Sequence, residues 1–204
     1  RDRLHSCAEQ EWGIGLIRSW NDASWIDLPV RAGAKIAKLI GVNPADVIVC
    51  DSVSSNIFKL AAALLKRRPG ATLAVTNDEF PTDQYVLAGL SGLTGAPLLR
   101  LRAHEPPPQG AVLVKSLVHY KTAAVADMAA LESEAATHGA EIVWDLSHAT
   151  GAIVIDAGPK GARYAVGCGY KYLNGGPGAP AFVYVRGDEA ASLSQPISGW
   201  MGAR

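Results

Sequence analysis

The sequence predicts an α/β fold in which helices cover both faces of one mostly parallel central sheet, a three-layer sandwich. Short apolar runs rich in β-branched residues alternate with longer segments whose apolar residues recur at helical spacing. Such alternation requires crossover connections, which join parallel strands. A hydrophobic fraction of 49% and 21 glycines in 204 residues suit a globular α/β protein with one large core.

The predicted helices are segments with apolar residues three and four positions apart. They span 28–40, 57–68, 85–93 and 124–138, and glycine follows several of them where a helix would end. The predicted strands are 47–50, 72–76, 98–101, 111–114, 141–144, 165–168 and 181–185. The run 47–50 is expected to be buried on both faces, because it is apolar throughout.

We expect one domain over 1–204. The chain starts abruptly at RDRLHSCAEQEW, which has no apolar signal segment, and stops equally abruptly at GWMGAR. Both ends therefore suggest a central piece of a longer protein, without an N-terminal segment and a C-terminal small domain.

Composition excludes several partners. Basic and acidic residues balance at 19 each, so no charge excess indicates nucleic acid or an anionic membrane surface, and no segment predicts a membrane span. Cys7, Cys50 and Cys168 are odd in number and lack metal-ligand spacing, which predicts no metal site and favours a reducing cytoplasm.

Ligands of open α/β sheets collect at the carboxyl ends of the strands, so the residues after each strand are the candidates for chemistry. The first candidate is the polar turn 51–56, whose hydroxyls and helix-initiating N–H groups could hold a phosphate. The alternative is that Ser54 or Ser55 only caps the helix. The second is Phe80-Pro81-Thr82-Asp83, where the ring could cover a planar cofactor or could simply pack.

The third candidate is Asp145, which ends a strongly apolar strand and is followed by Leu146-Ser147-His148. A buried carboxylate there needs a cation, and a protonated pyridine nitrogen or a nearby His or Arg would serve.

The fourth candidate is Lys171, which lies between two tyrosines in a glycine-rich segment. Desolvation there would favour the neutral amine that condenses with an aldehyde. Together the four strand ends supply a Schiff-base amine, an acid for the ring nitrogen, a ring cover and a phosphate cup, which are the needs of pyridoxal 5′-phosphate (PLP).

The residues also carry a family resemblance. The segments WGIGLIRSWND, DSVSSNIFKL, NDEFPTDQY, WDLSHATGA, GCGYKYLNGGPGAPAFVYV and SGWMG occur in this order along nearly the whole chain. With them the chain resembles kynureninase, a fold-type I PLP enzyme of the aspartate aminotransferase superfamily. The resemblance implies hydrolysis of L-kynurenine or 3-hydroxykynurenine to anthranilate or 3-hydroxyanthranilate and L-alanine, by a cytoplasmic homodimer in tryptophan catabolism and NAD biosynthesis.

The resemblance also implies roles for particular residues. Lys171 would hold PLP as a Schiff base and later move protons on the substrate, and Asp145 would hold the protonated ring nitrogen. Tyr170 would contact the phosphate and act as the candidate general base and oxyanion donor for hydration of the substrate ketone. The other implied cofactor contacts are Val53 and Ser54 at the phosphate, Phe80 on the ring, Pro81, Thr82 and Asp83 beside it, Ser116 and His148 near its polar edge, and Trp200 from the neighbouring subunit.

Two other functions remain open on the sequence. A cysteine desulfurase or class V aminotransferase would share the fold, although the mobile catalytic-cysteine loop of such desulfurases is not recognisable here. The third interpretation is a truncated, non-catalytic dimerisation scaffold, because the chain is half as long as expected for the family.

Overall fold

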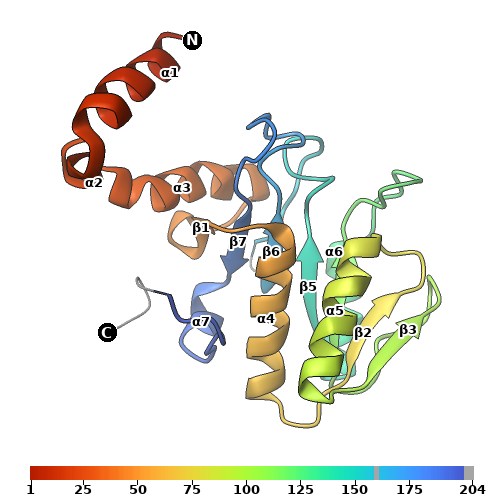
Figure 1. The fold of residues 1–204 in the computed structure, drawn as a ribbon. Coiled ribbons are helices and arrows are strands. Elements are labelled where there is room, and N and C mark those ends of the chain that lie inside the picture. The colour runs from red at the N-terminus through yellow and green to blue at the C-terminus, as the bar shows by residue number, and fades with distance from the viewer. Residues whose placement is uncertain (159–160, 200–204) are drawn as a thin grey trace.

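A single sheet organises the computed structural model, which describes residues 1–158 and 161–199. Seven strands within these residues lie in the order β1-β7-β6-β5-β4-β2-β3 (Figure 1). Their bounds are β1 Val47–Val49, β2 Leu73–Thr76, β3 Leu98–Leu101, β4 Val112–Ser116, β5 Glu141–Asp145, β6 Tyr164–Gly167 and β7 Phe182–Val185. Strands β2 to β6 pair in parallel, while β7 runs antiparallel to both β6 and β1. The predicted mostly parallel sheet is confirmed.

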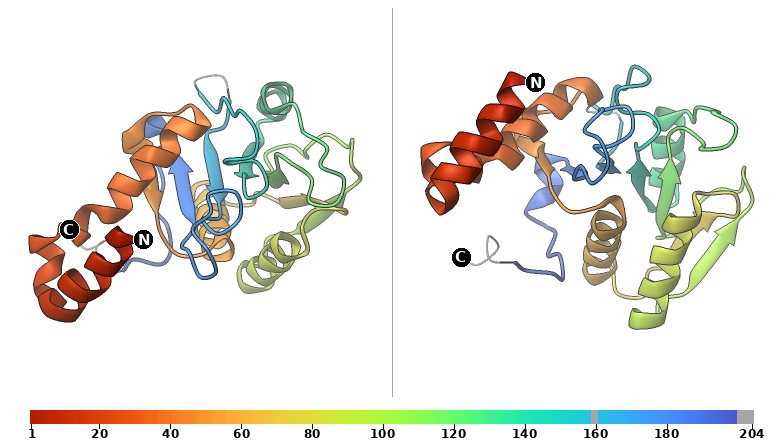
Figure 2. Two further views of the ribbon diagram at one scale, coloured as in Figure 1. Left: turned by 90° about the horizontal axis from the view of Figure 1, so that it is seen from above. Right: turned by 45° about the horizontal axis from the view of Figure 1, so that its top comes forward.

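Helices cover both faces of this sheet, as predicted. The α-helices are α1 Asp2–Ser6, α2 Ser19–Asp22, α3 Leu28–Ile40, α4 Val53–Arg67, α5 Pro81–Thr94, α6 Met128–Thr137 and α7 Gly187–Ala190. A π-helical segment Cys7–Gly15 and short 3-10 turns at Leu16–Arg18, Trp25–Asp27 and Pro44–Asp46 complete the helical segments. Helices α4 and α5 lie on one face, and α3 and α6 lie on the other (Figure 2).

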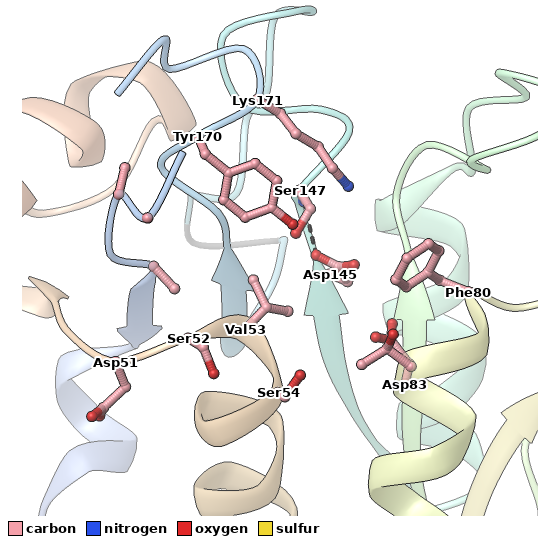
Figure 3. A pocket seen from close by; sticks show the side chains of 14 residues that line it. Asp51, Ser52, Val53, Ser54, Phe80, Asp83, Asp145, Ser147, Tyr170 and Lys171 are labelled. Carbon is pink, nitrogen blue, oxygen red and sulfur yellow. Dashed lines mark hydrogen bonds between the residues drawn. The ribbon is translucent and has the colours of Figure 1, made fainter. Parts of the chain in front are cut away.

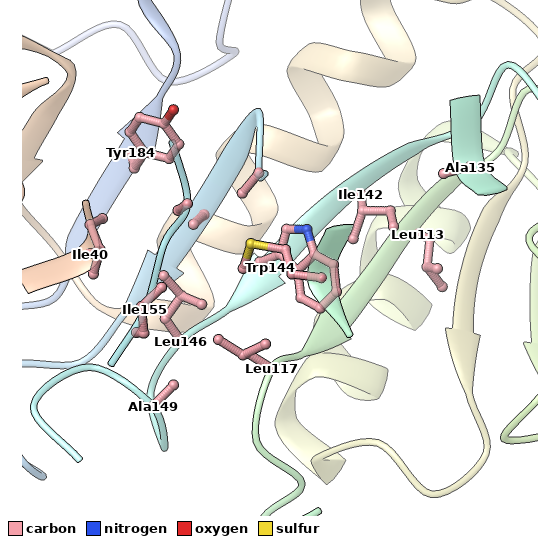
Figure 4. Close-up of a cluster of buried hydrophobic side chains, with 14 of the residues drawn as sticks. Ile40, Leu113, Leu117, Ala135, Ile142, Trp144, Leu146, Ala149, Ile155 and Tyr184 are labelled. Carbon is pink, nitrogen blue, oxygen red and sulfur yellow. The ribbon is translucent and has the colours of Figure 1, made fainter. Parts of the chain in front are cut away.

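The central strands are apolar on both faces because each face has its own helical layer. In β5, Ile142 and Trp144 join the core beneath α3 and α6 (Figure 4), whereas Val143 joins the core beneath α4 and α5. Successive side chains of a strand point to opposite faces, so each strand contributes to both cores. This double burial fixes the strand register, because slipping by one residue would exchange the two sets of side chains.

Four sequence predictions about elements were wrong in detail, one of them being the helix 124–138, since α6 begins four residues later, at Met128. Strand β1 lies at an edge of the sheet, and Ile48 is 41% exposed, so the strand is not buried on both faces. Helix α4 begins at Val53 and α5 at Pro81, four residues before the predicted starts in both cases. Ser52 precedes α4 and Pro81 lies in the first turn of α5, and both are helix start signals. They start the helices within segments that the sequence analysis places between a strand and a helix.

The segment before α3 forms an arm for which the sequence analysis predicted no element. Residues 2–22 are helical throughout and extend away from the sheet (Figures 1 and 2). Five large apolar side chains on the arm are more than half exposed: Leu4, Trp12, Ile14, Leu16 and Ile17. The arm therefore presents an apolar surface that the described residues leave uncovered.

The strand directions bring the candidate segments to one edge. Because β7 is antiparallel to both of its neighbours, β1 runs in the same direction as β6 and the other parallel strands. The carboxyl ends of β1, β2, β4, β5 and β6 therefore lie at the same edge of the sheet. In the part of the chain described here, no helix has the length and apolar character needed to cross a membrane.

Candidate active site

A cavity of about 410 Å³ lies at this edge, between the amino ends of α4 and α5 and the segment after β6 (Figure 3). This volume falls in the range of small-molecule sites. Its lining residues come from all four predicted strand ends and from the turn before β7. They are Asp51, Ser52, Val53, Ser54, Phe80, Thr82, Asp83, Asp145, Ser147, Tyr170, Lys171, Gly178, Ala179 and Ala181.

Lys171 is half-buried, and its amine points into the cavity above Asp145 (Figure 3). Nζ lies 2.9 Å from Nε2 of His148 and 5.3 Å from the centroid of the Phe80 ring. Burial, and then the charge of Lys171, lower the pKa of His148. The imidazole is therefore neutral near pH 7 and can accept a hydrogen bond from the amine.

Close backbone packing presents this lysine. A Cβ atom on Gly169 would lie 2.4 Å from the carbonyl oxygen of Pro180, and one on Gly167 would lie 2.5 Å from the Phe182 ring. Only glycine allows the segment after β6 to approach the start of β7 so closely. The flanking Tyr170 and Tyr172 are each 50% exposed, so the segment is less buried in this chain than its composition suggested.

Two buried carboxyl groups face the cavity. Asp145 ends β5 and is 3% exposed, and its Oδ1 accepts a hydrogen bond of 2.8 Å from the backbone N–H of Ser147. Asp83 lies in the first turn of α5 and is 1% exposed, and its Oδ2 is buried with no hydrogen-bond partner. Burial raises the pKa of Asp145, and burial followed by the charges of Asp145 and Glu79 raises the pKa of Asp83 to about 9. Oδ2 of Asp83 therefore lacks a hydrogen-bond donor, and the charge of Lys171, which opposes both shifts, does not outweigh burial.

The Phe80 ring forms one wall of the cavity, across from Tyr170 (Figure 3). Phe80 is the residue before α5, and the edge of its ring packs against Tyr120 with 5.2 Å between centroids and an interplanar angle of 85°. The His148 ring lies 6.2 Å away at 61°. These two aromatic contacts help to hold the Phe80 ring in place at the cavity.

The amino end of α4 forms a further wall of the cavity. The Ser52 hydroxyl accepts a hydrogen bond of 3.2 Å from the N–H of Ser55 and so caps the helix. The cap is thus Ser52, whereas the sequence alternative had proposed Ser54 or Ser55. The N–H groups of Val53 and Ser54 belong to the first turn, where helices lack internal acceptors, and they lie at the cavity with the positive end of the helix dipole.

Most of the predicted site residues meet at the cavity. Eight of them line it: Val53, Ser54, Phe80, Thr82, Asp83, Asp145, Tyr170 and Lys171. Three more lie next to these, since Pro81 starts α5, Ser116 pairs in register with Asp145, and His148 contacts Lys171. Trp200 lies outside the described residues.

Other lining residues were not predicted as site residues. Asp51 and Ser52 lie in the predicted polar turn, and their position just before a helix could have identified them. Ser147, Gly178, Ala179 and Ala181 are small and carry no sequence signal beyond their neighbours. Within 1–158 and 161–199, no group of three His, Cys, Asp or Glu side chains could hold a metal ion.

Comparison with known proteins places both the fold and the sequence. No protein-family model matches the chain. A kynureninase from Pseudomonas fluorescens is 42% identical, and the alignment covers 98% of this chain and 51% of the relative. A kynureninase from Deinococcus radiodurans is 43% identical with the same two coverages. The chain thus spans about half the length of these curated relatives.

Solved structures share the fold at low identity. A C-DES mutant with glycine covalently linked to its PLP cofactor aligns with a TM-score of 0.77 and 15% identity, covering 97% of this chain and 54% of that one. The apo cysteine desulfurase from Thermococcus onnurineus aligns with a TM-score of 0.71 and 18% identity, covering 85% and 46%.

Sheet order, helical layers and these structural neighbours define the class: the chain has the fold of the fold-type I PLP-dependent enzymes. Over 98% of its length the chain is a sequence homologue of curated kynureninases, and it corresponds to about half of their length.

Proposed function

We propose that the protein binds PLP in the cavity at the carboxyl edge of the sheet and uses it to hydrolyse L-kynurenine or 3-hydroxykynurenine. The observation that carries the proposal is that the amine of Lys171 and the carboxyl group of Asp145 line one cavity of cofactor size. The sequence relatives named kynureninase indicate the reaction. A carbon–carbon bond next to the ketone would be cleaved, releasing anthranilate or its 3-hydroxy form and L-alanine.

The residues present fit PLP. Oδ2 of Asp83 and Oγ of Ser116 are buried without hydrogen-bond partners, and burial raises the pKa values of both Asp83 and Asp145. A protonated ring nitrogen would supply the missing cation, and its charge would lower both pKa values. Within the described part of the cavity lining, Lys171 is the one lysine or arginine, and its charge opposes the raised pKa values of Asp83 and Asp145 without outweighing burial.

When bound, PLP supplies an aldehyde that condenses with amines and a ring that withdraws electrons from the substrate carbons. The Lys171 amine would bond to the aldehyde and move protons at the substrate carbons. The carboxylate of Asp145 would keep the ring nitrogen protonated, and Phe80 would cover one face of the ring. His148, which is neutral near pH 7, would accept a hydrogen bond from the Lys171 amine and so orient it in the cavity.

The other end of the cavity suits the phosphate. The N–H groups of Val53 and Ser54 and the dipole of α4 favour an anion there. Burial is the main cause that raises the pKa of Tyr170, so its hydroxyl stays protonated at neutral pH. The hydroxyl would therefore donate a hydrogen bond, first to the phosphate and then to the oxyanion formed when the substrate ketone is hydrated.

The chain would form the PLP-binding large domain of a homodimer. The apolar arm of residues 2–22 supports this, because its exposed Trp12, Leu16 and Ile17 would be covered by a second subunit. By family resemblance that subunit would also contribute its Trp200 to the phosphate. The three free cysteines support a cytoplasmic location.

The first test is a titration with PLP. Condensation of the aldehyde with a lysine produces a visible absorption band, which we expect in the natural full-length protein and expect to lose in Lys171→Ala. Lys38→Ala is the matched control, because Lys38 is exposed on α3 and does not line the cavity. A band of equal intensity in Lys171→Ala would contradict the assignment of the amine.

The second test identifies the reaction. Anthranilate fluorescence is expected on addition of L-kynurenine. The desulfurase and aminotransferase alternatives predict sulfide from cysteine or a keto acid instead. Sulfide or a keto acid without anthranilate would show that the proposed substrate is wrong, while the proposed cofactor would stand. PLP binding with no product at all would favour the scaffold interpretation.

A further inference from the structure

Glu79 precedes the cavity-lining residue Phe80 in the chain. Neither the sequence analysis nor the family resemblance assigned it a role. It is 1% exposed and is located in the turn between β2 and α5, one residue before Phe80. A fully buried carboxylate is costly unless donors and cations meet it. Its contacts therefore indicate what it does.

The two carboxylate oxygens bridge two separate elements. Oε1 accepts a hydrogen bond of 3.1 Å from the backbone N–H of Phe80, and Oε2 accepts one of 3.0 Å from the backbone N–H of Ser116 at the end of β4. Nζ of Lys115 lies 3.9 Å from Oε2 and partly balances the charge. The carboxylate thus ties the peptide that carries the ring cover to the end of a central strand.

The rest of the turn depends on the same residue. The Glu79 carbonyl accepts a hydrogen bond of 2.7 Å from the side-chain amide of Gln84, and its N–H donates one of 3.1 Å to the Thr76 carbonyl. Four hydrogen bonds therefore hold this one residue between β2, α5 and β4. Fixed neighbours of this kind determine where an adjacent side chain can lie.

We infer that Glu79 is a positioning residue that sets the location of the Phe80 ring over the cofactor by clamping the Phe80 and Ser116 peptides together. The inference rests on the proposed PLP site.

The test is a double-mutant cycle on PLP affinity, measured by equilibrium dialysis and by circular dichroism of the bound chromophore. In Glu79→Gln one oxygen becomes an NH₂ group that faces an N–H donor, so the clamp is broken at nearly constant volume. We expect PLP to bind about tenfold more weakly, the factor for losing one hydrogen bond to a charged group. In the Phe80→Ala background the same substitution should change affinity by less than about twofold, since residues that act together are not additive.

Two further variants separate positioning from general destabilisation. Glu132→Gln is the matched control, because Glu132 is also buried and accepts a 2.8 Å hydrogen bond, from Trp144, on the face of α6. It should leave PLP affinity and the dichroism signal unchanged. Glu79→Asp keeps the charge but is too short to bridge both peptides, so it should resemble Glu79→Gln and serves if that variant does not fold.

The outcomes distinguish the two proposals. If the unmodified protein binds PLP and both Glu79 variants bind it equally well with the same dichroism, the inference about Glu79 is wrong and the proposed function stands. Equal losses of PLP affinity on Glu79→Gln in the presence and absence of the Phe80 ring would also overturn the inference, because Glu79 would then not act through that ring. If the unmodified protein shows no PLP binding, the proposed function fails first, and this inference with it.

Discussion

Strand β5 carries a buried carboxylate at each end, and the two are satisfied in opposite ways. Glu141 begins the strand and is fully buried, and it is surrounded by cations: it forms an ion pair with Arg67, and Nε of Arg68 and Nη1 of Arg163 lie 2.9 and 3.2 Å from its oxygens. Asp145 ends the strand and is 3% exposed; its carboxyl group accepts a hydrogen bond from the Ser147 N–H, and Lys171 acts on it through its charge.

The difference shows how a structural acid can be distinguished from a functional one. A buried carboxylate that is paired from several sides fixes the elements that supply its partners, here α4 and the start of β6. A buried carboxyl group whose pKa stays raised by burial, in a cavity with one lysine, is available to bind a ligand. The acid at the start of β5 thus stabilises the fold, and the acid at its end is available for chemistry.

The largest effect is expected at the structural end. Glu141→Ala leaves Arg67, Arg68 and Arg163 close together without their shared anion. We expect a loss of about 3–5 kcal/mol in the free energy of unfolding, measured by urea denaturation. Glu134→Ala, an exposed glutamate on α6, is the control and should change it by less than about 0.5 kcal/mol. A loss below about 1 kcal/mol for Glu141→Ala would show that the cluster is not structural.

At Asp145, the functional end of β5, we expect a small effect on stability and a large effect on PLP binding. Asp145→Asn replaces an uncompensated carboxyl with a neutral group of the same shape, so we expect the stability of the cofactor-free protein to change by less than about 1 kcal/mol. PLP affinity should fall about 100-fold, because the ring nitrogen loses its charged partner. Urea denaturation without cofactor and PLP titration measure the two quantities. Should the variant unfold as easily as Glu141→Ala, the division between the two ends is wrong.

The third comparison concerns pH, where the effect of each single pH unit is the smallest of the three. The pKa of Asp83 is about 9 in the folded chain, against an ordinary value of 3.8, so the folded form binds more protons between these values. Stability of the cofactor-free protein should therefore decrease as pH rises from about 4 to 9, with a slope of at most about 1.4 kcal/mol per pH unit from this group. Asp83→Asn should flatten the curve measured by urea denaturation at several pH values. An unchanged curve would mean that Asp83 does not carry this proton.

Much of the fold could be predicted because the central strands are apolar on both faces. The run Glu141–Asp145 and the helix Leu28–Ile40 were identified nearly to the residue, since both have clear periodicity and ends. The starts of α4 and α5 were missed, because Ser54, Ser55 and Asn56 resemble a loop when the cap at Ser52 is not recognised. The arm 2–22 was missed because its apolar side chains are exposed and do not mark a buried face.

The site was predictable where function follows directly after a strand. Asp145 and Lys171 were identified in this way, and the cavity brings them together. Glu79 and the Glu141 cluster could not be predicted, because their partners are distant in sequence: Ser116 lies 37 residues from Glu79, and Arg67 lies 74 residues from Glu141. Only the packing of helices and turns against the sheet brings such residues into contact.

The most direct test of the site is chemical. PLP is added to the natural full-length protein, the bond to the amine is reduced with borohydride, and the modified peptide is identified by mass spectrometry. The cavity geometry predicts one dominant modification, at Lys171, that Asp145→Asn weakens. Modification spread over exposed lysines such as Lys35 and Lys38, with Lys171 unlabelled, would contradict it.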